Sequence, residues 1–484
     1  MVTSRYRILR SPARGGGKSQ VTSLKSQVTS LKSEISEESF TDFLSALKSL
    51  DYTGYAEQYP PFGSWEDVSA RRVNVRSVWL KSLKCSDETG LFVNIPFCKI
   101  RCRFCFLPVS AVGASGPARI ESFRRFFSAL ERECSFFSPV FKKTKIPSVY
   151  IGGGTPSLME PDEIKTFFNL LNRYFKIAPD AQIVLEIHPD DAGHDKISAF
   201  KSCGVNRICI GAQSLDKKVL SANYRRQRLD SVIKAYEACK ECGINGINID
   251  LICGLPGQNR KSFLTDLKNI AALRPDQLHL NTFINTPYTL HALAGGKGPD
   301  ERLVESIRQE GFALLKNAGY IRIDSDSMGL TPDSRNIQTT DLWKKKSMLG
   351  LGPGAISHAF SSARHMNYVR WEDYERIVRR RISPVARAVF IGEREEMIYF
   401  ALTKLTDELS LNLTEFKNIY GVSFKEAFKS QIKVLMKQGA YFVNDDFVLP
   451  SNMWCLVRQA FYQKKYLLKL REFSGKLFLE ETKD

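Results

Sequence analysis

Three cysteines near residue 100 have the residue type and spacing for metal or redox chemistry. Cys98, Cys102 and Cys105 stand at C-x3-C-x2-C spacing in the string FVNIPFCKIRCRFCF, directly after a short apolar run. Thiolates are soft ligands that suit iron–sulfur clusters or zinc. Structural zinc normally takes four ligands, and no fourth Cys or His lies close by in the sequence. A [4Fe-4S] cluster held by three cysteines would keep one iron open for a substrate that chelates through an amine and a carboxylate.

Composition and charge describe an ordinary globular chain with a basic surplus. Of its 484 residues, 43% are hydrophobic and 25% charged, which excludes collagen-like, wholly disordered and pure coiled-coil proteins. No apolar run approaches the ~18–20 residues that a membrane-spanning helix needs. The formal charge of +18 could indicate binding to nucleic acid, to an acidic membrane or to an anionic small molecule. The eleven cysteines are too sparse for a disulfide scaffold, so we expect a reducing, cytoplasmic location.

Residues 1–39 are predicted to form a basic, low-complexity leader. Residues 1–33 carry seven Lys or Arg and no acid, and the heptapeptide SQVTSLK occurs twice in tandem. The resulting apolar pattern spans about two heptads, fewer than the three to four that indicate a coiled coil, so we expect disorder. An organelle transit peptide is the alternative, because the segment is rich in Arg and Ser and poor in acids.

The region 91–300 alternates short apolar runs with amphipathic segments. Runs rich in β-branched residues recur at 91–95, 148–152, 183–187, 207–211, 247–252 and 278–283. Strand–helix alternation of this kind is typical of βαβ units and a parallel sheet. Six units are too few for a full eight-stranded barrel, so we predict an α/β fold, a partial, open (β/α)6 barrel of the TIM type. Its site should lie at the C-terminal ends of the strands.

The other segments are predicted to flank this core. Residues 40–90 would form an N-terminal arm, 301–390 an extension that closes the barrel, and 391–484 a mostly helical C-terminal domain. The strand–helix alternation fades beyond residue 300, and the chain beyond 370 is expected to be helical. Residues 393–450 could form a small winged-helix-like unit with a hairpin at 439–450.

The cysteine spacing is the signature of radical S-adenosylmethionine (radical SAM) enzymes. The fuller string IPFC…C.FC resembles the oxygen-independent coproporphyrinogen III oxidase family, and the resemblance runs from about residue 91 to 374. That family includes the porphyrinogen decarboxylase, haem chaperones, and SAM-dependent C-methylases and cyclopropanases. The resemblance implies that Cys98, Cys102 and Cys105 are catalytic ligands of a [4Fe-4S] cluster whose open iron binds SAM. One electron from that cluster would cleave SAM to a 5′-deoxyadenosyl radical, which abstracts hydrogen from the substrate.

Polar residues and glycines at the predicted strand ends match the family's SAM contacts. Glycines after the second strand would let the backbone approach a ligand closely, and an arginine can match a carboxylate bidentately. By resemblance, one of these positions, Ile252, contacts the adenine. The implied SAM-binding residues are Phe92, Gly153, Gly154, Thr155, Glu186, Gln213, Arg225, Asp250 and Ile252.

Two departures from the family pattern bear on the reaction. Phe92 stands where the decarboxylase has tyrosine, and Leu107 stands where it has a further cysteine. The haem chaperones begin close to their cysteine motif, whereas about ninety residues precede it here. We predict a radical SAM oxidoreductase that acts on a tetrapyrrole-like or other biosynthetic substrate. The alternatives are a C-methylase or cyclopropanase that uses a second SAM, and a non-catalytic haem chaperone.

The expected partners follow from this hypothesis. They are an anionic or tetrapyrrole small molecule and a reductant such as flavodoxin or ferredoxin, with no nucleic acid and no membrane span. Among the remaining residues, Cys239 and Cys242 lie on a predicted helix and are interpreted as packing residues. His188 beside Glu186 is a candidate substrate contact, and His358 is interpreted as structural.

Overall fold

The computed structural model describes residues 59–466, apart from 70–72, 229, 339–345, 451–453 and 464. The predicted leader at 1–39 and the start of the predicted arm lie outside the described residues. In the described part of the chain, no helix is both long and apolar enough to cross a membrane.

Six parallel strands form the centre of the fold and follow one another across the sheet in chain order. Every apolar run predicted between 91 and 283 overlaps one of these strands, so the predicted parallel sheet is confirmed. Their apolar residues, such as Val93, Ile151 and Ile208, are fully buried, as expected for strands covered on both faces. The strands are β2 (Thr89–Ile95), β5 (Lys145–Gly153), β6 (Lys176–Ile187), β7 (Arg207–Gln213), β8 (Gly246–Cys253) and β9 (Gln277–Thr282).

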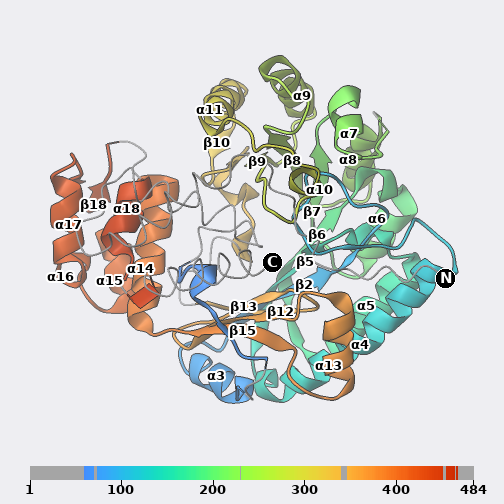
Figure 1. Ribbon diagram of the computed structural model, residues 1–484, viewed down its shortest axis with the longest axis horizontal. Helices are drawn as coiled ribbons and strands as arrows, with labels where there is room; N and C mark the ends of the chain where they lie inside the picture. Colours follow the sequence, from blue (N-terminus) through green and yellow to red (C-terminus); the bar gives the residue numbers. More distant parts are fainter. Residues whose placement is uncertain are drawn as a thin grey trace, which may run out of the picture.

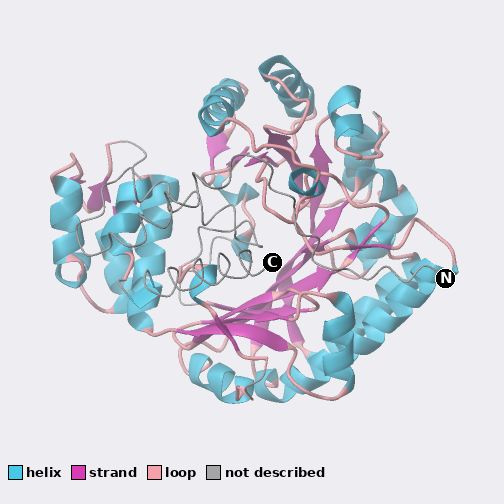
Figure 2. Cartoon of the chain, in the orientation of Figure 1, coloured by secondary structure: helices cyan, strands magenta, loops and turns pink. Residues whose placement is uncertain are grey.

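Helices between these strands cover the outer face of the curved sheet (Figures 1 and 2). In α5, Ile164, Phe167 and Leu171 recur at three- and four-residue spacing and are completely buried, which fixes the face that packs on the sheet. A capping box between Glu160 and Glu163 starts this helix. The covering helices are α4 (Pro117–Phe141), α5 (Pro161–Tyr174), α6 (His194–Ser202), α7 (Lys217–Ala222), α8 (Ser231–Glu241), α9 (Arg260–Ala272) and α11 (Glu301–Asn317).

Further strands extend the sheet at both edges to thirteen strands. Antiparallel strands β11 (Ser327–Gly329) and β10 (Ile321–Arg322) follow β9. Beyond β2, strand β12 pairs in parallel, and β13, β14, β15 and β1 continue in antiparallel order. The bounds are β12 (Ser347–Leu351), β13 (Ile356–Ala359), β14 (Ala363–Asn367), β15 (Val385–Phe390) and β1 (Glu66–Asp67).

These edge strands correct one sequence expectation. Strand β15 interrupts the stretch that was expected to be helical after 370. Strands β12 and β14 are short and buried almost throughout, so the sequence shows no polar–apolar alternation there. Within the described residues, 301–390 lengthens the sheet and no strand pairing joins its two edges.

A buried carboxylate attaches the edge strands to the core. Glu133 of α4 accepts hydrogen bonds from the Gly352 amide at 2.7 Å, from Asn367 Nδ2 at 2.6 Å and from the Tyr374 hydroxyl. Burial raises the pKa of Glu133 to about 7. The turn after β12, the end of β14 and helix α13 (Trp371–Arg379) thus converge on one side chain of α4.

The C-terminal part, at the left of Figure 1, is mostly helical, as predicted. Its apolar core is separate from that of the barrel and also includes Tyr59, Phe62 and Trp65. Phe416, Phe424, Phe428 and Phe447 lie at its centre and are almost fully buried. The predicted hairpin is present as β17 (Tyr441–Val443) and β18 (Asp446–Val448), and the winged-helix interpretation stays a prediction. The other elements are α14 (Glu393–Thr403), a π-helical turn (Lys404–Glu408), β16 (Ser410–Asn412), α15 (Leu413–Tyr420), α16 (Phe424–Ala427), α17 (Lys429–Met436) and α18 (Trp454–Phe461).

The Glu133 network predicts a specific loss of stability. Tyr374→Phe removes one hydrogen bond to a buried carboxylate and should lower the free energy of unfolding by about 1–3 kcal/mol. Tyr441→Phe, on the exposed strand β17, should change it little. Urea denaturation followed by circular dichroism measures both variants. Equal unfolding midpoints for Tyr374→Phe and the unmodified protein would show that the network does not stabilise the fold.

Candidate cluster and cofactor site

A large cavity opens at the C-terminal ends of the parallel strands, where the barrel prediction placed the site. Its volume is about 2210 Å³, whereas ordinary small-molecule pockets measure ~300–1,000 Å³. The cysteine loop, the ends of β5 to β9, the start of α11 and the π-helical turn of the C-terminal part all contribute lining residues. The cavity therefore has room for more than one ligand.

The structure brings all but one of the predicted site residues to this cavity. Phe92 is the exception, because it lies farther back along β2, where its ring centroid is 5.9 Å from that of Tyr150. The predicted residues that line the cavity are Cys98, Cys102, Cys105, Gly153, Gly154, Thr155, Glu186, Gln213, Arg225, Asp250 and Ile252.

The three cysteines lie on a loop that begins at β3 (Phe97–Cys98), directly after β2. The Thr155 hydroxyl donates to Cys98 Sγ at 3.4 Å, and Arg225 Nη1 lies 3.9 Å from Cys102 Sγ. Burial raises the pKa of Cys98 to about 12 and that of Cys105 to about 11. Both side chains are therefore thiols at neutral pH until a metal displaces their protons.

This set of donors fits an iron–sulfur cluster. In the described part of the chain, no three His, Cys, Asp or Glu side chains are placed to hold a single metal ion. A [4Fe-4S] cluster does not require three side chains to meet at one metal ion, because each thiolate binds a different iron. Three sulfurs on one loop, with the Arg225 guanidinium beside one of them, match a cluster with three protein ligands and one open iron.

The glycine-rich turn after β5 fits tightly against neighbouring segments. Gly153 has a φ of +101°, and a Cβ there would collide with the Asn94 side chain. A Cβ on Gly154 would collide with the backbone of Phe97, and one on Gly152 would lie 2.8 Å from the Glu186 carboxylate. The sequence suggested that these glycines let the backbone approach a ligand closely. The structure shows that they let the turn after β5 pack closely against neighbouring segments of the protein.

Glu186 at the end of β6 is held in a fixed orientation. Its carboxylate accepts hydrogen bonds from the Tyr150 hydroxyl at 2.6 Å and from the Gly153 amide at 3.1 Å. Burial raises the pKa of Glu186 to about 7, although the hydrogen bond from Tyr150 opposes this shift. The carboxyl group is therefore close to its titration point at neutral pH and faces the cavity.

Gln213 ends β7, and Arg225 lies in the loop after α7, with its guanidinium beside the cysteine loop. Gln213 has a φ of +65° at an irregular position of the β7–β8 pairing, and Arg225 donates to the carbonyl oxygen of Gly211. Arg225 Nε also donates to Gln227 at 2.9 Å. These contacts hold the guanidinium at the cavity wall beside Cys102.

Sequence reasoning missed the partners of Asp250. Asn248 Nδ2 donates to Asp250 Oδ1 at 2.7 Å, and His279 Nδ1 lies 3.4 Å from the same oxygen. Although burial opposes it, the interaction of the imidazole with the Asp250 carboxylate raises the pKa of His279. Asp250 and His279 are paired in register across β8 and β9. In the sequence, each is a polar residue within an otherwise apolar strand, and this pattern could have indicated that the two residues interact.

The structure places the remaining candidate residues as follows, and the substrate contact of His188 stays a prediction. His188 lines the cavity, and burial, aided by Arg225 and Lys99, lowers the pKa of its imidazole well below the usual value. His358 is buried with Nε2 2.8 Å from the Glu396 carboxylate, which is a structural role. Cys239 belongs to α8 and is buried in the core, as expected of a packing residue.

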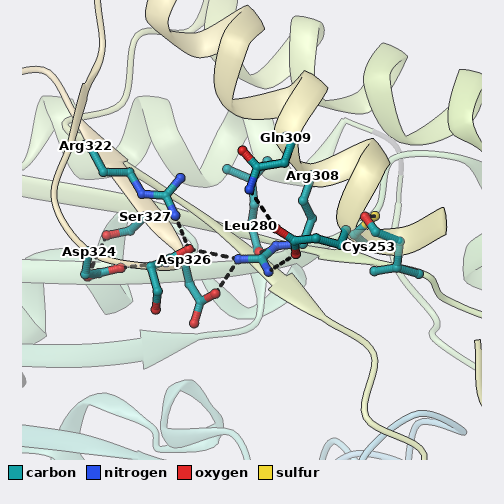
Figure 3. A network of polar contacts seen from close by, with 11 residues as sticks. Cys253, Leu280, Arg308, Gln309, Arg322, Asp324, Asp326 and Ser327 are labelled. Atoms are coloured by element: carbon teal, nitrogen blue, oxygen red, sulfur yellow. Dashed lines mark hydrogen bonds and ion pairs between the residues drawn. The ribbon is translucent and has the colours of Figure 1, made fainter. Parts of the chain in front are cut away.

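A charged wall of the cavity, absent from the sequence prediction, lies between α11 and the edge strand β11 (Figure 3). Arg308 donates to the Leu280 carbonyl at 3.0 Å and also pairs with Asp326. Arg322 lies 3.6 Å over the Phe312 ring and donates to the Ser325 carbonyl. These guanidinium groups are engaged by the protein itself.

Comparisons with known proteins agree with this geometry. A model of the "Radical SAM superfamily" matches residues 94–270. The oxygen-independent coproporphyrinogen III oxidase of Escherichia coli K12 is 30% identical over 284 residues, covering 55% of this chain and 61% of the relative. That of Bradyrhizobium diazoefficiens is 25% identical over 393 residues, covering 77% and 86%. The heme chaperone HemW of Escherichia coli K12 is 26% identical over 266 residues, covering 55% and 69%.

A solved structure shows the same fold. Coproporphyrinogen III oxidase (HemN) from Escherichia coli superposes with a TM-score of 0.70 at 23% identity, covering 85% of this chain and 98% of that one. Radical SAM proteins use a [4Fe-4S] cluster and SAM, and the three cysteines described above lie within the matched residues. Residues 94–270 of the chain therefore match the radical SAM superfamily, and the chain is similar to the oxygen-independent coproporphyrinogen III oxidases.

Proposed function

We propose that this protein is a radical SAM oxidoreductase in which Cys98, Cys102 and Cys105 hold the [4Fe-4S] cluster. When bound and reduced, the cluster supplies the electron that cleaves SAM and so generates the radical that takes hydrogen from the substrate. One observation carries the proposal: the cysteine loop and eight of the nine predicted SAM contacts line one cavity at the carboxyl ends of the strands.

The polar wall residues would orient SAM. Arg225 and Gln213 lie beside the cysteine loop and suit the carboxylate of the methionine part. Glu186 and Asp250 are acceptors for the ribose hydroxyls, and each is already held by hydrogen bonds from neighbouring side chains. The protein therefore presents fixed acceptors and does not have to reorganise them when SAM binds.

An apolar group would seat the adenine and exclude water. Ile252 packs with Phe104 against a small buried cluster that includes Leu255 and Phe283. Phe92 does not line the cavity, so we assign it a positioning role: its ring packs beside Tyr150, which donates to Glu186.

The remaining volume would hold the substrate. Arg302 and Arg335 line the cavity, and within the described residues neither guanidinium has an ion-pair partner, whereas Arg308 and Arg322 are engaged by the protein. Two such cations favour an anionic substrate, in keeping with the coproporphyrinogen that appears in the names of the oxidases reported above. We therefore propose a carboxylated, tetrapyrrole-like substrate that loses hydrogen.

A second candidate function is a SAM-dependent C-methylase or cyclopropanase. The size of the cavity favours it, because about 2210 Å³ leaves space for a second SAM. The heme chaperone among the relatives makes non-catalytic haem binding the third possibility that the experiment must separate.

Product analysis tests the proposed function. Protein reconstituted with iron and sulfide under anaerobic conditions, then mixed with SAM, dithionite and coproporphyrinogen III, should release 5′-deoxyadenosine. With a one-electron acceptor added after this step to take the electron left on the substrate, it should also release carbon dioxide. Stoichiometric S-adenosylhomocysteine would instead support methyl transfer. Stable haem uptake with no cleavage of SAM would contradict the enzyme assignment.

The pKa of Glu186 predicts how SAM affinity depends on pH. Without SAM this carboxyl group has a pKa of about 7, whereas ribose hydroxyls that donate to it favour the ionised form. Below pH 7 binding must therefore release a proton, so the affinity should fall by up to about tenfold per pH unit as the pH decreases. Above pH 7 it should be constant.

Equilibrium binding of SAM between pH 5.5 and 8.5 measures this dependence. Glu186→Gln should bind SAM more weakly at pH 8 and should lose the Glu186-dependent fall in affinity below pH 7. Glu131→Gln, which changes an exposed carboxylate on α4, is the matched control and should keep the profile of the unmodified protein. If Glu186→Gln keeps the pH dependence of SAM affinity seen in the unmodified protein, Glu186 does not bind SAM.

A further inference from the structure

His188 is a polar side chain of the cavity wall that is not among the SAM contacts implied by the family. It directly follows β6 and caps the short 3-10 turn Pro189–Asp191. Its backbone amide donates to Ser157 Oγ at 3.0 Å, which fixes its position at the strand end. The imidazole lines the cavity, and within the described ranges of the chain no residue bonds to its Nε2 atom. His188 thus offers one ring nitrogen to a ligand.

The turn that follows His188 joins two loops beside the cluster ligands. The buried carboxylate of Asp191 forms an ion pair with Lys99 of the cysteine loop. Asp190 Oδ1 accepts a hydrogen bond at 3.2 Å from the amide of Arg228, in the loop after α7. His188 therefore lies where the end of β6 meets the cysteine loop and the loop after α7.

The hydrogen bonding of the imidazole determines which nitrogen carries the hydrogen. Nδ1 of His188 accepts a hydrogen bond from the Asp190 amide at 3.2 Å, so its lone pair is occupied. In a neutral imidazole the hydrogen then lies on Nε2. Burial and the nearby charges of Arg225 and Lys99 lower the pKa of His188 well below its usual value, so the ring stays neutral. Nε2 is therefore an N–H donor and, in this tautomer, has no lone pair for an iron atom.

The surroundings of this donor favour an anion. Arg225 and Lys99 are the charged groups that act most strongly on His188, and both are positive. Arg225 Nη1 is also 3.9 Å from Cys102 Sγ, so this corner of the cavity adjoins the cysteine loop. SAM has one carboxylate, in its methionine part. If the open iron takes SAM through its amine and carboxylate, that carboxylate lies in this corner.

We propose that His188 Nε2–H donates a hydrogen bond to the methionine carboxylate of SAM, beside Arg225 and Gln213. A charged acceptor makes such a bond roughly twice as strong as one between neutral groups. His188 binds and orients the carboxylate, and no proton is transferred. The position between the two loops favours this contact over the substrate contact expected from the sequence. The inference rests on the proposed function, because it requires a cluster that binds SAM.

Two ligands that differ by one carboxylate test the contact. SAM and decarboxylated SAM are each titrated by anaerobic calorimetry into the reconstituted protein. His188→Phe should raise the Kd for SAM at least about tenfold and change the Kd for decarboxylated SAM less than about twofold. The stoichiometry of each titration reports the loaded fraction, so partial loss of the cluster does not mimic a loss of affinity.

Two further variants separate the hydrogen bond from the shape of the side chain. His188→Gln should keep most of the affinity for SAM, because its amide can accept from the Asp190 amide and donate to the carboxylate. His194→Phe is the matched control. It replaces an exposed histidine at the start of α6 and should bind both ligands like the unmodified protein.

The outcomes distinguish this contact from the proposed function. Unchanged SAM affinity in His188→Phe would overturn the contact alone, and so would an equal loss of affinity for both ligands, which indicates a disturbed cavity. Normal SAM affinity together with a raised KM for the tetrapyrrole would assign His188 to the substrate and overturn the contact with SAM. If the unmodified protein with a loaded cluster binds no SAM, the proposed function itself fails.

Discussion

The site depends on the close contact between the glycine turn after β5 and the loop that carries the cysteines. The amide of Gly154 donates to the Ile95 carbonyl at 2.7 Å, and the amide of Thr155 donates to the Phe97 carbonyl at the same distance. This contact is possible because residues 153 and 154 have no side chains to separate the two segments. It places the Thr155 hydroxyl against Cys98 Sγ and so fixes the start of the cysteine loop relative to the rest of the strand ends.

A second constraint is the set of ionisable groups that the barrel buries near its open end. Glu186, Asp250 and His279 lie among apolar strands, where each charge is costly unless it is hydrogen-bonded. Tyr150 and Asn248 supply part of that bonding, and acceptor capacity remains directed at the cavity. The fold thus carries polar groups whose bonding a bound ligand would complete, which is the usual sign of a binding site.

The sequence was sufficient to predict the parts of the fold and site that rest on local pattern. The six parallel strands are buried on both faces and appear as continuous β-branched runs, and the cysteine spacing lies within one loop. The contacts that join distant segments could not be predicted, because nothing in the sequence near Glu133 indicates that Gly352, Asn367 and Tyr374 donate to it. The same holds for His279, whose importance arises only from its register opposite Asp250.

If three cysteines hold a [4Fe-4S] cluster with one open iron, that iron should take SAM. Electron paramagnetic resonance of the reduced, reconstituted protein should give a cluster signal that changes when SAM is added. The signal should be absent in Cys102→Ala, while Cys85→Ala, which alters an exposed cysteine outside the site, should behave normally. A signal that does not respond to SAM, or one that persists in Cys102→Ala, would rule out a SAM-binding cluster on these three cysteines.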